Sequence, residues 1–223
     1  MLSDESVPSK SQVGATIGFS SIIFCDSSNK GMKIDIILYL YTKKTDAMKT
    51  FSEVVNRRRS CRKFEVRKVT REVIDLLLKE ALTAPSARNT RSTRFAVTED
   101  PATLEKLSRM RNYGSLFLKD APVVVAILGE TSHTDLWREN GAISATILQL
   151  SAEAHGLGSC WVHVHDRLRN NDDPDGPRAE DYAREILKVP DHLAILCLIA
   201  LGYPADPPQP RREQDDTDKI TYL

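Results

Sequence analysis

Five cations surround one serine and one cysteine in the segment "NRRRSCRKF", residues 56–64. In an extended chain, Arg58, Ser60 and Arg62 would point to one side and Arg59 to the other. Guanidinium groups match the oxygens of a phosphate, and a serine hydroxyl adds a further donor. The spacing therefore allows a phosphate site built from side chains, because the glycine-rich motifs GxxxxGK[ST] and GxGxxG do not occur in the chain. A solvated loop would explain the same run of charge.

A second segment with hydrogen-bonding side chains, "APSARNTRSTRF", covers residues 84–95 and follows a helical pattern. Pro85 would end that helix, while Ser86 and Asn89 would offer donors and acceptors to a ligand. A plain connection between a helix and a strand explains this segment equally well.

Two glycines and a tryptophan mark a third segment, "AHGLGSCWVHV", residues 154–164. Gly156 would end a helix, and Gly158 would let the backbone pass close to something flat or to a neighbouring helix. Trp161 and the amides that follow it would then frame an aromatic ligand. In the simpler interpretation the glycines form only a cap and a turn, and Trp161 belongs to the core.

The charge balance excludes whole classes of partner. The chain has 223 residues, with 31 Lys plus Arg and 31 Asp plus Glu, so no large field would draw it to nucleic acid or to an anionic membrane. No apolar run approaches the ~18 residues of a membrane helix. Acidic residues stand where a signal peptide would carry cations. We expect a cytoplasmic protein with neither a nucleic-acid nor a membrane partner.

The cysteines point to the same compartment. They lie far apart, with no CxxC pair and no metal-ligand spacing, which indicates free thiols in a reducing environment and no metal site. They are Cys25, Cys61, Cys160 and Cys197.

Helical and extended patterns alternate along most of the chain. Helices are predicted from residue 50, where "TFSE" forms a capping box, and at residues 71–84, 100–111, 135–155 and 178–189. Strands are predicted at residues 93–98, 122–128, 158–164 and 193–201. The alternation predicts an α/β or α+β fold with one central sheet between helices.

The two ends of the chain differ from its middle. Residues 1–47 are serine-rich and show no sustained period, and their apolar run, Ile34 to Tyr41, fits a strand or a helix. We therefore expect a compact domain over residues 48–223, with residues 1–47 as a poorly ordered extension or a wrongly assigned start. Near the other end, "KITYL" alternates like a strand, which would need a partner in its own sheet or in another subunit.

Taken in order, these motifs resemble those of the nitroreductase family of flavin enzymes, over residues 48–223. The family pattern combines R-R-S-x-R-x-F, A-P-S-x-x-N, G-L-G-S-x-W, a buried strand ending in GYP, and a basic pair. The matching positions are Arg58, Arg59, Ser60, Arg62 and Phe64; Ala84, Pro85, Ser86 and Asn89; Gly156 to Ser159 and Trp161; Leu201 to Pro204; and Arg211 or Arg212. The resemblance implies an α+β fold with a mostly antiparallel central sheet, flanked by helices, and a C-terminal arm exchanged in a homodimer.

The resemblance also implies an enzyme. It would transfer hydride from NADH or NADPH through FMN to a small acceptor such as a nitroaromatic, a quinone or an enone. FMN would carry the chemistry, so no side chain is expected to act as a nucleophile or general base. The implied FMN-binding residues are Arg58, Arg59, Ser60, Arg62 and Arg211 or Arg212 around the phosphate and ribityl chain; Pro85, Ser86 and Asn89 from the other subunit; and the backbone around Trp161, Val162 and His163 at the N5 and O4 edge.

Two positions depart from the family pattern. Arg91 stands where a glutamine is usual, and the C-terminal K-x-R-x-P is imperfect, so the choice between Arg211 and Arg212 stays open. The same scaffold would also support a flavin reductase, a dehalogenase or a flavin-binding module without turnover.

Overall fold

A four-stranded antiparallel sheet forms the centre of this computed structural model, which describes residues 49–212 and 214–223. The strands are β1 (Thr93–Thr98), β2 (Val123–Glu130), β3 (Gly158–His163) and β4 (Leu193–Gly202), in the order β1-β2-β4-β3. All three neighbouring pairs are antiparallel, which confirms the expected α+β sheet. The predictions for residues 1–47, including the run at 34–41, lie outside the described residues.

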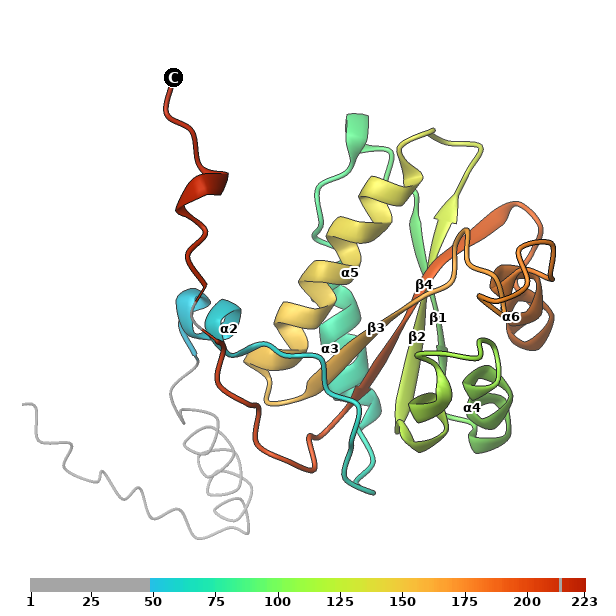
Figure 1. Ribbon diagram of the computed structural model, residues 1–223, viewed down its shortest axis with the longest axis horizontal. Coiled ribbons are helices and arrows are strands. Elements are labelled where there is room, and N and C mark those ends of the chain that lie inside the picture. Colours follow the sequence, from blue (N-terminus) through green and yellow to red (C-terminus); the bar gives the residue numbers. More distant parts are fainter. Residues whose placement is uncertain (1–48, 213) are drawn as a thin grey trace, which may run out of the picture. The chain divides into compact units, whose positions relative to one another are not determined.

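Helices cover both faces of the sheet (Figure 1). On one face lie α3 (Arg71–Ala81) and α5 (Trp137–Ala154), with the short α2 (Phe51–Arg57) beside the end of α5. On the other face lie α4 (Pro101–Ser108) and α6 (Ala179–Leu187). None of these helices, the ones in the described part of the chain, is both long and apolar enough to cross a membrane.

The two central strands read as continuous apolar runs because both of their faces are buried. Val125 and Ile127 of β2 join the core under α3 and α5, whereas Val124 and Ala126 join the core under α4 and α6. The register from Val123↔Leu201 onward is interrupted by an irregularity after Ile127. Alternation therefore continues in the structure although it is invisible in the hydropathy of the sequence.

Local sequence signals set most element boundaries. The capping box is present: the Glu53 amide donates to Thr50 Oγ1 at 3.3 Å, and the Thr50 amide donates to Glu53 Oε2 at 2.7 Å. The Thr103 amide donates to Asp100 Oδ2 at 3.0 Å, and Pro101 occupies the first turn of α4, as predicted. The three cysteines within the described residues are free thiols: Cys61, Cys160 and Cys197.

The C-terminal arm does not form the predicted strand. Residues 217–219 make one 3₁₀ turn, and the last four residues carry no regular structure. Ile220 is 61% exposed and Tyr222 is 92% exposed, so neither side chain packs on this chain. A strand gains little without a partner to satisfy its backbone, and one chain provides none here. Exchange of the arm between two subunits stays a prediction.

The doubly buried β4 should dominate the stability of the fold. Leu198 is fully buried at its centre, so Leu198→Ala should lower the free energy of unfolding by ~2–5 kcal/mol through lost transfer energy and a residual cavity. Val66→Ala is the matched control, because Val66 is fully exposed and should cost less than ~0.5 kcal/mol. Urea denaturation followed by circular dichroism measures both; similar costs for the two variants would contradict the packing described.

Candidate functional site

The basic segment lies extended along the open edge of β3. The Cys61 amide donates to the Ser159 carbonyl at 2.9 Å, and Ser60 forms a parallel bridge with Ser159. Further on, the segment pairs with the chain that leaves β4: the Glu65 amide donates to the Tyr203 carbonyl at 2.8 Å. The segment is thus fixed at both ends by backbone hydrogen bonds and bridges.

Gly158 makes this close approach possible. A Cβ at this position would lie 2.6 Å from Cys61 Cβ and 2.8 Å from Cys61 Sγ, closer than real atoms approach. Gly156 serves a different purpose, because its φ of +79° places it in the left-handed region just after α5. The turn interpretation therefore holds for Gly156, and Gly158 is needed for the packing of the basic segment itself.

The cations of this region fall into two groups. Arg57 Nε and Lys49 Nζ both reach Glu153 Oε1, at 3.3 Å and 2.8 Å, and this shared carboxylate joins α2 to the end of α5. By contrast, within the described residues neither Arg58, Arg59 nor Arg62 has an acidic group within 4.0 Å.

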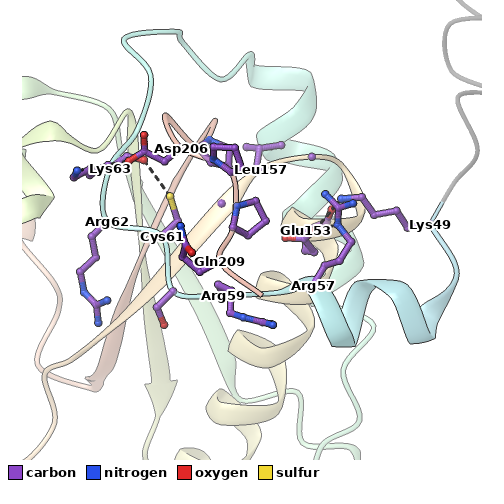
Figure 2. Close-up of a pocket in the computed structure, with 16 residues that line it drawn as sticks. Lys49, Arg57, Arg59, Cys61, Arg62, Lys63, Glu153, Leu157, Asp206 and Gln209 are labelled. Carbon is purple, nitrogen blue, oxygen red and sulfur yellow. Dashed lines mark hydrogen bonds and ion pairs between the residues drawn. The ribbon is translucent and has the colours of Figure 1, made fainter. Parts of the chain in front are cut away.

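The unpaired guanidinium groups are positioned by neutral contacts. Arg59 Nη1 donates to the Asn56 carbonyl at 2.7 Å, and Arg62 Cζ lies 5.9 Å from the centroid of the Phe117 ring. Arg59 and Arg62 leave the segment in different directions (Figure 2). These contacts orient the charges without neutralising them, which is the condition that an anion site requires.

A cavity of about 430 Å³ lies between this segment and the chain after β4. Its lining includes Arg59, Ser60 and Arg62 together with Gly158 and Pro204 (Figure 2). Arg59 also lines a second hollow, with Arg211 and Arg212 from the C-terminal arm. Arg59 and both arginines of the arm therefore border one hollow, and the choice between Arg211 and Arg212 as a phosphate ligand stays a prediction.

Beyond Ser159, β3 pairs with β4 on one side only, and no strand of the described chain pairs with its other side. Val162 is buried under the core, whereas the Trp161 ring is half-buried and its Nε1 is buried without an acceptor in the described residues. The His163 ring is exposed and lies 5.3 Å from the Trp161 ring, centroid to centroid. The core interpretation of Trp161 is correct for much of its side chain, yet the backbone edge of the strand stays open.

The pKa of His163 is lowered from its ordinary value, first by burial and then by the positive charges of Arg167 and Arg111. Both effects favour the neutral imidazole near pH 7. The pKa of the Cys61 thiol is raised, chiefly by burial, which leaves it protonated and unsuited to act as a nucleophile at that pH.

Pro85, Ser86 and Asn89 are not brought to this cavity. Their loop is tied to the start of α5, where the Ala87 amide donates to Asn140 Oδ1 at 2.9 Å. The basic segment lies near Glu153, at the other end of the same helix. Thirteen residues separate Asn140 from Glu153, which is roughly 20 Å at 1.5 Å per residue.

The loop after Ser86 has an unusual backbone that the sequence did not indicate. Arg88, Asn89 and Arg91 have φ values of 52°, 53° and 48°, all in the left-handed region. Asparagine tolerates this conformation, but an arginine there costs roughly 1 kcal/mol. The Arg91 amide donates to Ser86 Oγ at 2.9 Å, which helps to hold the turn.

Sequence reasoning missed two groups that hold the site together. Glu153 anchors α2 from 104 residues away, and the Asn140 side chain, only 2% exposed, holds the loop after α3. For Asn140, the only signal in the sequence is a polar residue at a position that the helical pattern would bury. No local signal pairs Glu153 with Lys49.

Comparison with known proteins agrees with this geometry. Residues 55–112 and 106–203 match the family model described as the nitroreductase family. A protein of Methanothermobacter thermautotrophicus, named as a putative NADH dehydrogenase/NAD(P)H nitroreductase, is 33% identical over 171 residues, which cover 75% of this chain and 84% of that protein.

Solved structures resemble the chain as well. An FMN-dependent nitroreductase from Clostridium difficile R20291 is 36% identical, with a TM-score of 0.70, covering 76% of this chain and 96% of that one. A putative NADH dehydrogenase/NAD(P)H nitroreductase from Parabacteroides distasonis is 27% identical, with a TM-score of 0.69, covering 77% of this chain and 96% of that one.

Gly158→Ala should push the basic segment off β3. Overpacking of this kind costs ~1–3 kcal/mol, so hydrogen exchange at the Cys61 amide should become about tenfold to hundredfold faster. Mass spectrometry of the peptide over residues 58–64 measures the exchange. Adding Cys61→Gly to Gly158→Ala removes the clashing atoms and should restore protection, with Cys61→Gly alone as the control. Unchanged exchange in Gly158→Ala would show that the contact does not hold the segment.

Proposed function

Because the chain belongs to the nitroreductase family and is an oxidoreductase of that family, we propose that it binds FMN and transfers hydride from NADH or NADPH to a small acceptor such as a nitroaromatic, a quinone or an enone. The names of its relatives, which include an FMN-dependent nitroreductase and NAD(P)H nitroreductases, support the assignment.

The observation that carries the proposal is the set of guanidinium groups that lack a carboxylate partner. Arg58 and Arg62 stand two residues before and after Ser60 in the segment, and a phosphate monoester would supply both the missing negative charge and acceptors for these donors. Hydrogen bonds to a charged group are worth ~1.5–3 kcal/mol each, so a few of them would hold one phosphate firmly. The donor set therefore fits the phosphate end of FMN, with Arg211 or Arg212 closing the site from the arm.

The rest of FMN would lie along the open edge of β3. Ser159 faces the open edge, and alternate residues of a strand face the same side, so the amides of Trp161 and His163, on either side of Val162, would face the edge of the ring that takes part in hydride transfer. When bound, FMN would supply the hydride-transfer chemistry, since no protein side chain carries it. The protein would bind, orient and shield the ring.

Three of the four other histidines have carboxylate partners, which supports a reaction without a protein general base. His155 Nε2 lies 3.2 Å from Glu80, and His165 Nδ1 lies 3.0 Å from Glu180. His133 Nε2 lies 3.0 Å from Glu130. Each of these imidazoles is paired with a carboxylate on its own part of the fold, so structural roles account for them.

The proposal includes a homodimer, because the residues implied in FMN binding lie at opposite ends of α5. The outward face of this helix carries an apolar stripe at helical spacing: Ile143, Ile147, Leu150 and Ala154, of which Ile143 is 40% exposed. If two copies of α5 pack antiparallel about a two-fold axis, the start of one helix lies beside the end of the other. The partner's loop with Ser86 and Asn89 would then reach the basic segment.

Replacing Arg58 and Arg62 together with Ala should release FMN while the fold persists, because these side chains make no ion pairs within the described chain. The expected loss of FMN affinity is at least about a hundredfold, for two charge-assisted contacts removed. Flavin absorbance after gel filtration gives the stoichiometry, and circular dichroism checks the fold. The double variant Lys68→Ala and Arg71→Ala removes the same charge from exposed positions and should keep its flavin. Full retention of FMN by the first double variant would refute the phosphate assignment.

Ile143→Glu should separate the subunits. The residue is exposed in one chain, so the fold should tolerate a carboxylate, whereas burying an unpaired charge in the interface should raise the dimer dissociation constant at least about a hundredfold. Light scattering after gel filtration gives the mass, and flavin content should fall with it. Val66→Glu carries the same new charge at an exposed position away from α5 and should stay dimeric. If the wild-type protein is a monomer at micromolar concentration, the proposal that two chains together form the FMN site is wrong.

A further inference from the structure

Two loops at the far end of β3 are joined into one unit. They are residues 109–115, after α4, and residues 164–171, after β3. The Asn112 amide donates to the Arg169 carbonyl at 2.8 Å, and Asn112 Nδ2 donates to Asn170 Oδ1 at 2.6 Å. The Arg169 guanidinium donates back to the Met110 carbonyl at 3.3 Å. These bonds fix the position of any side chain that the two loops present.

Arg111 and Arg167 lie on this unit, one on each of the two bonded loops, and have no counter-charge among the described residues. Across residues 49–212 and 214–223, neither has an acidic group within 4.0 Å, whereas Arg109 nearby pairs with Glu105 at 2.7 Å. The pKa of Arg111 is lowered, first by burial and then by the positive charge of Arg167. Two like charges held together are costly unless an anion joins them.

Arg111 also has an unused donor. Its Nε is buried and bonds to no acceptor in the part of the chain that the structure describes, and its Nη2 reaches Asn171 Oδ1 only at 3.4 Å. A buried donor without an acceptor costs ~1–3 kcal/mol. An anion would satisfy the donor and neutralise the pair at the same time.

The arginine pair lies at the opposite end of β3 from the basic segment. The positive charges of both guanidinium groups lower the pKa of His163, the last residue of the strand. Ser159, which holds the basic segment, is four residues earlier, roughly 13 Å away at 3.3 Å per residue. A hollow of about 320 Å³ borders Arg111 but not Arg167, and its other lining residues are Arg109, Asn112, Arg169, Asn170 and Pro177.

An exposed aromatic ring narrows the choice of ligand. Tyr113, two residues after Arg111 on the same loop, is 62% exposed, so its ring is available for a flat base to stack on. We propose that Arg111 and Arg167 form a second anion-binding site, which takes the 2′-phosphate of NADPH and makes NADPH the preferred reductant. This inference rests on the proposed function, because the reductant must reach a ring bound along β3.

Calorimetry with two unreactive fragments tests the site without turnover. FMN-saturated protein is titrated with adenosine 2′,5′-bisphosphate and with 5′-AMP, which lacks the 2′-phosphate. The bisphosphate should bind at least about tenfold more tightly, and Arg111→Gln and Arg167→Gln should each weaken it by about tenfold without changing 5′-AMP. Arg71→Gln removes the same charge from the paired, exposed Arg71 on α3 and should change neither titration. In turnover assays, kcat/KM should be higher with NADPH than with NADH for the wild type, and Arg111→Gln and Arg167→Gln should each lose this preference.

Equal binding of the two fragments, or an unchanged preference in both arginine variants, would overturn the proposal. An electron acceptor with a carboxylate is the alternative ligand for the arginine pair. The rate of reduction of para-nitrobenzoate is therefore compared with that of its neutral analogue, para-nitrobenzamide. If the variants slow reduction of the benzoate alone and leave the fragment titrations unchanged, the assignment to NADPH is wrong. Flavin absorbance in the same samples keeps the two proposals apart, because a chain that takes up no FMN refutes the proposed function before any fragment is added.

Discussion

Positive charge that the chain does not neutralise is held at the edge of β3, and this constraint organises the site. Arg58, Arg59 and Arg62 repel one another, so their positions depend on neutral contacts and on the backbone pairing of Cys61 with Ser159. That pairing depends in turn on the missing side chain at Gly158. A ligand that binds the folded chain but not the unfolded one adds stability in proportion to the logarithm of its concentration over its dissociation constant. An anion bound among these guanidinium groups would reduce their mutual repulsion and so would stabilise the folded chain.

Helix α5 imposes the second constraint. It holds the loop after α3 at one end through Asn140 and holds α2 at the other end through Glu153. Because a helix does not shorten, the two groups of residues stay roughly 20 Å apart within one chain. In the proposed dimer, the apolar outward stripe of α5 would pack against a second copy, and the partner's loop would lie beside the basic segment. Helix α5 would thus keep the two groups of FMN-binding residues apart within one chain and bring them together between two chains.

Much of the fold could be predicted because its signals are local. The bounds of β1, the capping box at Thr50 and the Asp100 cap of α4 depend on neighbouring residues, and the structure has them as expected. The pairing of Glu153 with Lys49 and the clamp between Asn112 and Arg169 depend on residues far apart in sequence, for which one sequence holds no signal. The left-handed turn at Arg88 was also missed, since arginine does not favour it. The predicted C-terminal strand is wrong for a single chain, because alternation specifies a strand only where a partner exists.

Arginines without a carboxylate partner in the described residues lie at both ends of β3. Arg57, Arg71, Arg94, Arg109 and Arg184 each have a carboxylate within 4.0 Å, whereas Arg58, Arg59 and Arg62 near one end of the strand and Arg111 and Arg167 near the other do not. Arg67 and Arg138 also lack a carboxylate, but they lie over the rings of Tyr203 and Trp137. With a Debye length of ~8–10 Å, charges at ends roughly 13 Å apart are largely screened from each other where solvent reaches them. Under the two proposals, each end of β3 would therefore bind its own anionic group, and a flat ligand would lie across the uncharged strand between them.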